Sequence, residues 1–280
     1  MTRLMKSIFL LVTLAFLPGF GTIERLFAPS ANLWPRWERN DPNSRESIDH
    51  TPWDNLLSRH VRTSDQGVNL VDYHGFSTGD RTMLADYITI LSGVPISQFN
   101  RDQQLAYWVN LYNALTVRVV LDHYPVDSIR DINISPGLFA TGPWDKKLIS
   151  IEGENLTLND IEHRIMRPIW RDPRIHYVVN CASIGCPNLR HRAYSGTEID
   201  TALDRAATAY VNDPRGVSVV DGKVSVSKIY DWFIEDFGGS EGMVLRHLQR
   251  YAAPELAARL EAIGKLSDVH YDWSINLAAE

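Results

Sequence analysis

The sequence predicts a single α+β domain in which a small, mostly antiparallel sheet packs with several helices. Three observations lead to this prediction. Apolar residues recur at helical spacing in several segments, and the longest of these covers residues 101–123. Asp221-Gly222 separates two short β-branched runs, which is the strongest hairpin signal in the chain. Helices and strands alternate irregularly, whereas a doubly wound parallel sheet would need regular βαβ units.

The composition is that of an ordinary globular protein. The chain has 280 residues, of which 44% are hydrophobic and 22% are charged, enough for one large domain or two small ones. The formal net charge of −6 argues against a nucleic-acid partner, because nucleic acids bind basic surfaces. No sequence signal indicates a cofactor, and the ligand class that remains open is an unknown small molecule or peptide.

Residues 1–21 have the pattern of a secretory signal peptide. Arg3 and Lys6 precede an apolar run over residues 8–17, and small residues follow it. The run is shorter than the roughly 20 residues that a membrane span needs. We therefore expect a periplasmic or secreted protein. An uncleaved anchor in the inner membrane is the alternative, and we expect no other membrane contact.

Residues 22–50 contain three prolines among polar residues, and we expect a linker or a loosely docked arm there. The α+β domain should cover residues 51–280. Thr51-Pro52 gives a start signal for a helix over residues 53–61. A short strand is expected at 68–73, and a helix over 81–91 should end at Gly93.

The helix over residues 101–123 is expected to lie at the centre of the core, because its apolar positions continue over the whole segment. It carries Asn110 and Asn113 beside Tyr112. A buried amide without a hydrogen-bond partner costs about 1–3 kcal/mol. These amides therefore either tie the helix to a neighbouring loop or point into a cleft and hold a substrate.

The second half of the chain continues the irregular alternation. Residues 129–134 and 148–151 are expected to be extended. Thr157 and Asp160 predict the start of a helix over 157–166, and a β-branched run predicts a buried strand over 175–179. Helices are then expected over 197–211, 229–237, 243–251 and 254–263, with a hairpin at 217–226 and a final strand at 269–275.

The turn that follows residue 179 holds the candidate chemistry. It contains both cysteines of the chain, Cys181 and Cys186, with His176 before them and His191 after them. An oxidising compartment favours a disulfide, and cysteines five residues apart can be joined if the turn brings their Cα atoms within roughly 7 Å.

Four motifs in the same order resemble the "domain of unknown function 547" family. They are the sequence WVNLYN at 108–113, Ile161-Glu162-His163, the stretch from His176 through Asn180-Cys181-Ala182-Ser183 to Cys186-Pro187, and the tail at 271–276. The resemblance covers about residues 50–277. It implies a family that is widespread in bacteria, often on exported proteins, and that also occurs in eukaryotes, often joined to other modules. It marks positions without naming a reaction.

The first functional hypothesis is a cysteine-dependent hydrolase or acyltransferase, with a distant likeness to papain and transglutaminase folds. Cys181 would be the nucleophile and His163 or His176 the acid/base. Glu162, Asp272 or one of the two amides would orient the histidine. The substrate-binding residues that we expect are Trp108, Asn110, Tyr112, Asn113 and Ser183. In an extended strand, however, His176 would lie about 16 Å from Cys181 and point to the opposite face.

Two alternatives remain open from the sequence. In one, the protein is a binding or scaffold domain without turnover, and Cys181–Cys186 is a disulfide that pins the turn. In the other, the cysteines perform thiol-redox chemistry or bind a metal with His163, His176 or His191. The C-x4-C spacing is wider than the redox C-x-x-C, and no second ligand pair with zinc spacing is present. We therefore assign no metal ligands.

Overall fold

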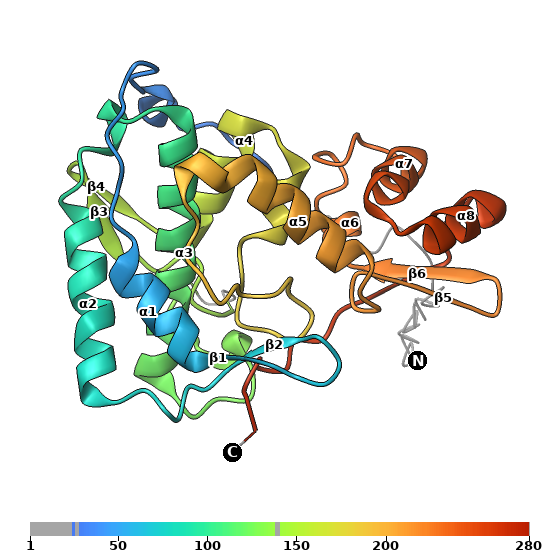
Figure 1. The fold of residues 1–280 in the computed structure, drawn as a ribbon, viewed down its shortest axis with the longest axis horizontal. Helices are drawn as coiled ribbons and strands as arrows, with labels where there is room; N and C mark the ends of the chain where they lie inside the picture. Colours follow the sequence, from blue (N-terminus) through green and yellow to red (C-terminus); the bar gives the residue numbers. More distant parts are fainter. Residues whose placement is uncertain (1–23, 26–27, 138–140, 280) are drawn as a thin grey trace, which may run out of the picture.

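The computed structural model describes residues 24–25, 28–137 and 141–279, and it confirms the α+β class (Figure 1). The α-helices are α1 (Thr51–His60), α2 (Thr78–Ser92), α3 (Arg101–His123), α4 (Arg167–Trp170), α5 (Ile199–Val211), α6 (Ile229–Trp232), α7 (Glu241–Tyr251) and α8 (Pro254–Ile263). The strands are β1 (Val61–Thr63), β2 (Asn69–Val71), β3 (Ile149–Ile151), β4 (Glu154–Leu156), β5 (Val217–Val220), β6 (Lys223–Ser227) and β7 (Asp268–His270).

The strands of the described residues form three small sheets instead of the one sheet that we expected. β1 pairs with β2, β3 pairs with β4, and the third sheet has the order β5-β6-β7. The hairpin at Asp221-Gly222 is confirmed, and both residues have positive φ, as a two-residue hairpin turn of type I′ requires. Strands of three to five residues pair mainly within local hairpins, so they do not assemble into one larger sheet.

Helix α3 confirms the predicted range and lies in the main hydrophobic core. Its first free N–H groups are capped by Asn100, whose side chain accepts from the Gln103 amide. It is buried on nearly every side and packs against α2 and α5 (Figure 1). Because α3 is packed on nearly every side, its Asn110, Tyr112 and Asn113 side chains are held in fixed positions.

A second hydrophobic core lies between α5, α7, α8 and the three-stranded sheet, at the right of Figure 1. Tyr177 belongs to this second core, whereas the neighbouring Ile175 and Val178 belong to the core around α3. The segment just before the cysteines therefore lies where the two cores meet.

The predicted strand over residues 175–179 is wrong. Residues Pro173–Tyr177 form a 3₁₀-helix, η6, because Pro173 fits the first helical turn and the Asp172 side chain accepts from the Arg174 amide. The extended segment expected at 129–134 is likewise a 3₁₀-helix, Ile129–Asp131, in its first half. In both segments local capping favours a 3₁₀-helix, although the β-branched residues favour a strand.

The helix expected over 157–166 is a π-helix, η5 (Asp160–Met166), which continues into α4. At its end the Arg167 amide donates to the Glu162 carbonyl, five residues back. Pro168 lies within α4, so the helix continues past residue 166, where we expected it to end. π-Helical turns are rare and occur frequently at functional sites.

The described part of residues 22–50 packs against the domain. Trp37 is only 3% exposed and meets Trp108 edge to face, with ring centroids 5.1 Å apart. The Asn32 and Trp34 amides donate to carbonyls of η5. Residues 28–50 thus cover η5 and the start of α3, where we had expected a linker or a loosely docked arm.

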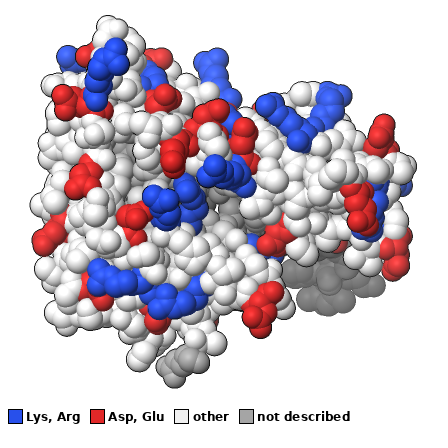
Figure 2. Space-filling view, in the orientation of Figure 1, with Lys and Arg blue, Asp and Glu red and all other residues white. Residues whose placement is uncertain are grey.

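The expected signal peptide at residues 1–21 lies outside the described residues. Within the described part of the chain, no helix combines the length and the apolar character needed to cross a membrane. Lys and Arg side chains are interspersed with Asp and Glu on the face shown in Figure 2.

Candidate functional site

A cavity of about 490 Å³ lies between η5, the cysteine turn, α6 and the C-terminal segment. The four residues predicted as catalytic, Cys181, His163, His176 and Glu162, all line it. Six aromatic residues also line it. The aromatic residues are Tyr112, Trp144, Trp232, Phe233, Tyr271 and Trp273. The fold therefore brings the predicted catalytic residues to one hollow, although they come from three separate segments.

The two cysteines are joined as a disulfide in this structure, and no other cysteine is present. Three groups contact the sulfur atoms. The Tyr271 hydroxyl lies 3.1 Å from Cys181 Sγ and 3.2 Å from Cys186 Sγ, and the Ser183 hydroxyl lies 3.2 Å from Cys181 Sγ. The Cys181 amide donates to Cys186 Sγ at 3.0 Å. In this oxidised state Cys181 has no thiolate with which to attack a substrate.

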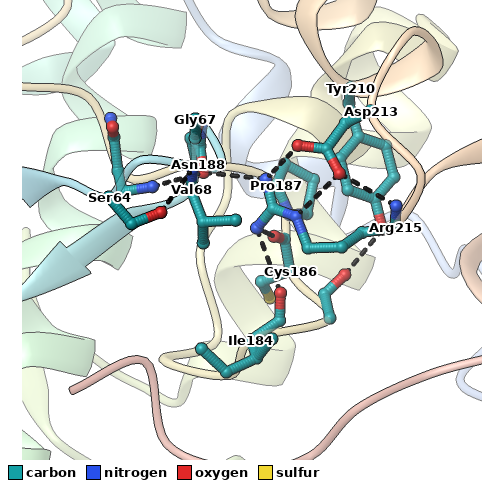
Figure 3. Close-up of polar contacts among 12 residues, drawn as sticks. Ser64, Gly67, Val68, Ile184, Cys186, Pro187, Asn188, Tyr210, Asp213 and Arg215 are labelled. Carbon is teal, nitrogen blue, oxygen red and sulfur yellow. Dashed lines mark hydrogen bonds and ion pairs between the residues drawn. The ribbon is translucent and has the colours of Figure 1, made fainter. Parts of the chain in front are cut away.

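Arg215 binds the backbone of the cysteine turn, as Figure 3 shows. One of its terminal nitrogens donates to the carbonyls of Ile184 and Cys186, both at 3.1 Å. The other donates to Asn188 at 3.0 Å and pairs with Asp213 at 2.8 Å. Because the guanidinium contacts two backbone carbonyls of the turn and a side chain just after it, it fixes the turn's shape.

The amides of α3 hold the same region from the core side. The Asn113 side chain donates to the Val178 carbonyl at 2.9 Å and accepts from the Asn180 amide at 2.8 Å. Asn110 makes the equivalent pair of bonds with the backbone of Tyr194. Both amides thus tie α3 to loops, and among the residues that the structure describes neither lines the cavity.

The other predicted substrate-binding residues are divided between core and cavity. Tyr112 lines the cavity. Trp108 lies in the core, with edge-to-face contacts to Trp37 and Tyr107. Ser183 is buried beside the disulfide and Tyr271. A substrate-binding role for any of these residues stays a prediction.

A network of ionisable groups begins at the cavity lining with Glu162, His163 and His176 and continues to Asp236 and Arg167. His176 Nε2 donates to Asp236 at 2.7 Å, and His176 Nδ1 lies 3.7 Å from Glu162 Oε1. The His176 ring also stacks on Phe233, with centroids 4.4 Å apart. With its proton on Nε2, the imidazole presents Nδ1 as an acceptor next to the Glu162 carboxylate.

Arg167 connects His163 to the same network of ionisable groups. Its guanidinium donates to His163 Nδ1 at 2.9 Å and pairs with Asp236 at 2.6 Å. A guanidinium can only donate, so His163 Nδ1 is the unprotonated nitrogen and Nε2 carries the proton. Glu162 Oε1 lies 3.9 Å from His163 Nδ1, beyond hydrogen-bond distance.

Burial and these contacts shift the pKa values of the site. Burial lowers the pKa of His163 to about 4, although Glu162 opposes the shift, so this ring is neutral at pH 7. Burial alone would raise the pKa of Asp236, but the hydrogen bonds from His176 and Arg167 outweigh it and hold that pKa well below its usual range. Burial and the neighbouring Glu162 raise the pKa of Tyr112 well above its usual value.

Several residues of the site were not predicted from the sequence. Asp236 and Arg167 gave no signal, because their roles depend on a contact between α4 and the segment after α6. Tyr271 lies in the family-like tail at 271–276, so that motif was a usable signal. The structure places His191 next to Thr63, and the Asp272 carboxylate accepts from the Ser274 amide. In the described ranges, no group of three or more His, Cys, Asp or Glu is placed to hold a metal ion.

The model of the family described as "Protein of unknown function, DUF547" matches residues 96–211. Three of the four motifs lie inside the matched region, and the tail at 271–276 follows it. No curated protein and no solved structure matches the chain. The likeness to papain and transglutaminase folds stays a prediction.

Proposed function

We propose that this chain, a member of the DUF547 family over residues 96–211, is an exported binding domain whose cavity holds a small ligand with an ammonium group. The observation that carries the proposal is the Glu162 carboxylate. It is part of the cavity wall, its residue is only 7% exposed, and among the described residues no Lys or Arg pairs with it. A carboxylate in such surroundings favours a cation from outside.

The second acceptor beside Glu162 supports an ammonium in particular. His176 Nδ1 and Glu162 Oε1 are 3.7 Å apart, too far for a direct hydrogen bond but close enough to accept from one group placed between them. An ammonium has three N–H donors, so it can bond both acceptors at once. The neutral His163 ring adds no positive charge that would repel such a ligand.

The aromatic walls favour the same class of ligand. The faces of Trp and Tyr rings attract cations within about 6 Å, and they also bury the carbon chain of an organic amine. Two charged residues of the lining already have partners. Glu24 pairs with Lys228 at 2.8 Å, and the Arg130 guanidinium lies 5.2 Å from the centroid of the Trp273 ring. Asp145, the remaining acidic residue of the lining, is exposed, so Glu162 is the buried acidic anchor in this proposal.

A pair of matched probes tests the proposal. Nα-acetyl-lysine amide and Nα-acetyl-norleucine amide share the same butyl chain and differ in the terminal ammonium. By calorimetric titration at pH 7.5, we expect the lysine probe to bind at least about tenfold more tightly, which corresponds to about 1.4 kcal/mol. Glu162→Gln should abolish this preference, because the amide keeps the shape of the side chain and loses its charge.

Glu235→Gln is the control for net charge, since Glu235 is 79% exposed and lies outside the cavity lining. It should leave the preference unchanged. Equal affinity for both probes, no binding of the lysine probe, or an unchanged preference in Glu162→Gln would each contradict the proposal.

A cysteine-dependent hydrolase or acyltransferase is the second candidate, and one observation favours it. Cys181 is partly exposed and lines the same cavity as Glu162, His163 and His176, so its reduced form would share the hollow with two imidazoles. After mild reduction, an activated ester probe should acylate Cys181 and turn over, and Cys181→Ser should lose both signals while Cys186→Ser keeps acylation. Lack of a mass increase in the reduced protein would defeat this candidate.

A further inference from the structure

The two sulfur atoms of the disulfide lie in different surroundings. Both cysteines line the cavity, but Cys181 is partly exposed whereas Cys186 is only 4% exposed. A thiol that enters the cavity therefore meets Cys181 first. An attack on Cys181 makes Cys186 the leaving group, so the surroundings of Cys186 decide how readily the disulfide opens.

We propose that Cys181–Cys186 is a redox-active disulfide that exchanges with a low-molecular-weight thiol in this cavity. The inference does not depend on the ammonium ligand, because it concerns the sulfur atoms and their contacts. It adds an activity to the binding function: reduction of the disulfide by two thiols, or the oxidation of two thiols in the reverse direction.

The first step breaks the S–S bond. The incoming thiolate attacks Cys181 Sγ and forms a mixed disulfide, and the bonding electron pair leaves with Cys186 as a thiolate. Two donors are in place for this charge: the Cys181 amide at 3.0 Å and the Tyr271 hydroxyl at 3.2 Å. Hydrogen bonds to a thiolate lower the pKa of its thiol, and a thiol of lower pKa leaves faster.

The second step releases Cys181. A second thiolate attacks the sulfur of the first thiol in the mixed disulfide, and Cys181 leaves as a thiolate that then takes up a proton. The Ser183 and Tyr271 hydroxyls lie 3.2 and 3.1 Å from Cys181 Sγ and are placed to stabilise it. In total, two thiols are oxidised to one disulfide, and both cysteines are reduced to thiols.

The turn keeps its shape by contacts that do not involve the sulfur atoms. Arg215 bonds the Ile184 and Cys186 carbonyls, the Tyr210 hydroxyl donates to the Gly185 carbonyl at 2.6 Å, and Asn113 holds Asn180. The covalent link closes only a short loop, so its entropic contribution to stability is modest. Reduction should therefore leave the two thiols close together and ready to reform the bond.

The experiment uses the full folded chain in buffers of reduced and oxidised glutathione at pH 7.5, with alkylation of free thiols and mass spectrometry. We expect millimolar reduced glutathione to open the disulfide while the circular dichroism spectrum stays native. Tyr271→Phe should slow this reduction about fivefold or more and raise the apparent pKa of the reactive thiol. Tyr107→Phe is the control, because the Tyr107 hydroxyl donates to the Leu91 carbonyl in the core. This variant should leave the reduction rate and the apparent thiol pKa unchanged.

Two further variants identify the sulfur that is attacked. With oxidised glutathione, Cys186→Ser should form a mixed disulfide at Cys181, while Cys181→Ser should react at least about tenfold more slowly at the buried Cys186. Reduction only after unfolding, equal glutathionylation of the two variants, or a Tyr271→Phe variant that reacts like wild type would overturn the inference. Any of these results would leave the binding proposal standing, because the probe titrations do not involve the cysteines.

Discussion

Replacing Arg167 with methionine is expected to lower the free energy of unfolding by about 3–5 kcal/mol, because it breaks a buried ion pair by removing one partner. The Arg167 side chain is only 3% exposed and pairs with Asp236 at 2.6 Å. It also donates to His163 Nδ1 and to the Pro29 carbonyl at 2.7 Å. Urea unfolding at pH 7.5, followed by fluorescence, measures the change.

Arg164→Met is the matched control on the preceding turn. The Arg164 side chain is 39% exposed and pairs with Asp160, so its loss should cost about 1 kcal/mol or less. The double variant Arg167→Met with Asp236→Leu removes both charges and should recover part of the lost stability. If the free energy of unfolding of Arg167→Met stays within 1 kcal/mol of the wild-type value, the ion pair between Arg167 and Asp236 does not stabilise the fold as predicted.

The second large effect is a loss of stability in mild acid. Burial lowers the pKa of both His50 and His163 to about 4 in the folded state, below the value of about 6.5 in an unfolded chain. The unfolded state therefore binds more protons between these two values. The stability that the neutral rings contribute is present above pH 6.5 and is lost as the pH falls towards 4.

pH 5 lies about 1.5 units below the unfolded-state pKa of each ring, which corresponds to about 2 kcal/mol of lost stability per ring. Together the two rings should therefore lower the free energy of unfolding by about 4 kcal/mol relative to pH 7.5. His247 has its pKa lowered to about 4 by partial burial and acts in the same direction. Asp236 does not contribute in this window, because a carboxyl with a lowered pKa loses its contribution only below the unfolded value of about 3.9.

Urea unfolding at pH 7.5 and pH 5.0 checks this prediction, and His50→Gln should remove about 2 kcal/mol of the pH dependence. Tyr87→Phe is the control, since it removes the hydroxyl 2.7 Å from His50 Nδ1 but keeps the imidazole. It should lower the stability at both pH values and retain the pH dependence. Equal stability of the wild type at the two pH values would show that these rings are not buried in neutral form.

The sequence by itself determined the α+β class, the range of α3 and the hairpin at Asp221-Gly222, and it singled out Cys181, His163, His176 and Glu162, which line one cavity. These features follow from side-chain periodicity and turn chemistry, which act between residues near in sequence. The same local signals failed at 175–179, where Pro173 and the Asp172 cap favoured a 3₁₀-helix over the strand that the β-branched residues indicate.

Only the tertiary structure decided what each cavity residue contacts. His176 faces Glu162 on one side and Asp236, sixty residues later, on the other, and Tyr271 reaches the disulfide from the C-terminal segment. Such contacts depend on how the two hydrophobic cores pack against each other. Packing is set by the shapes of many side chains together, so no periodicity along the chain encodes it.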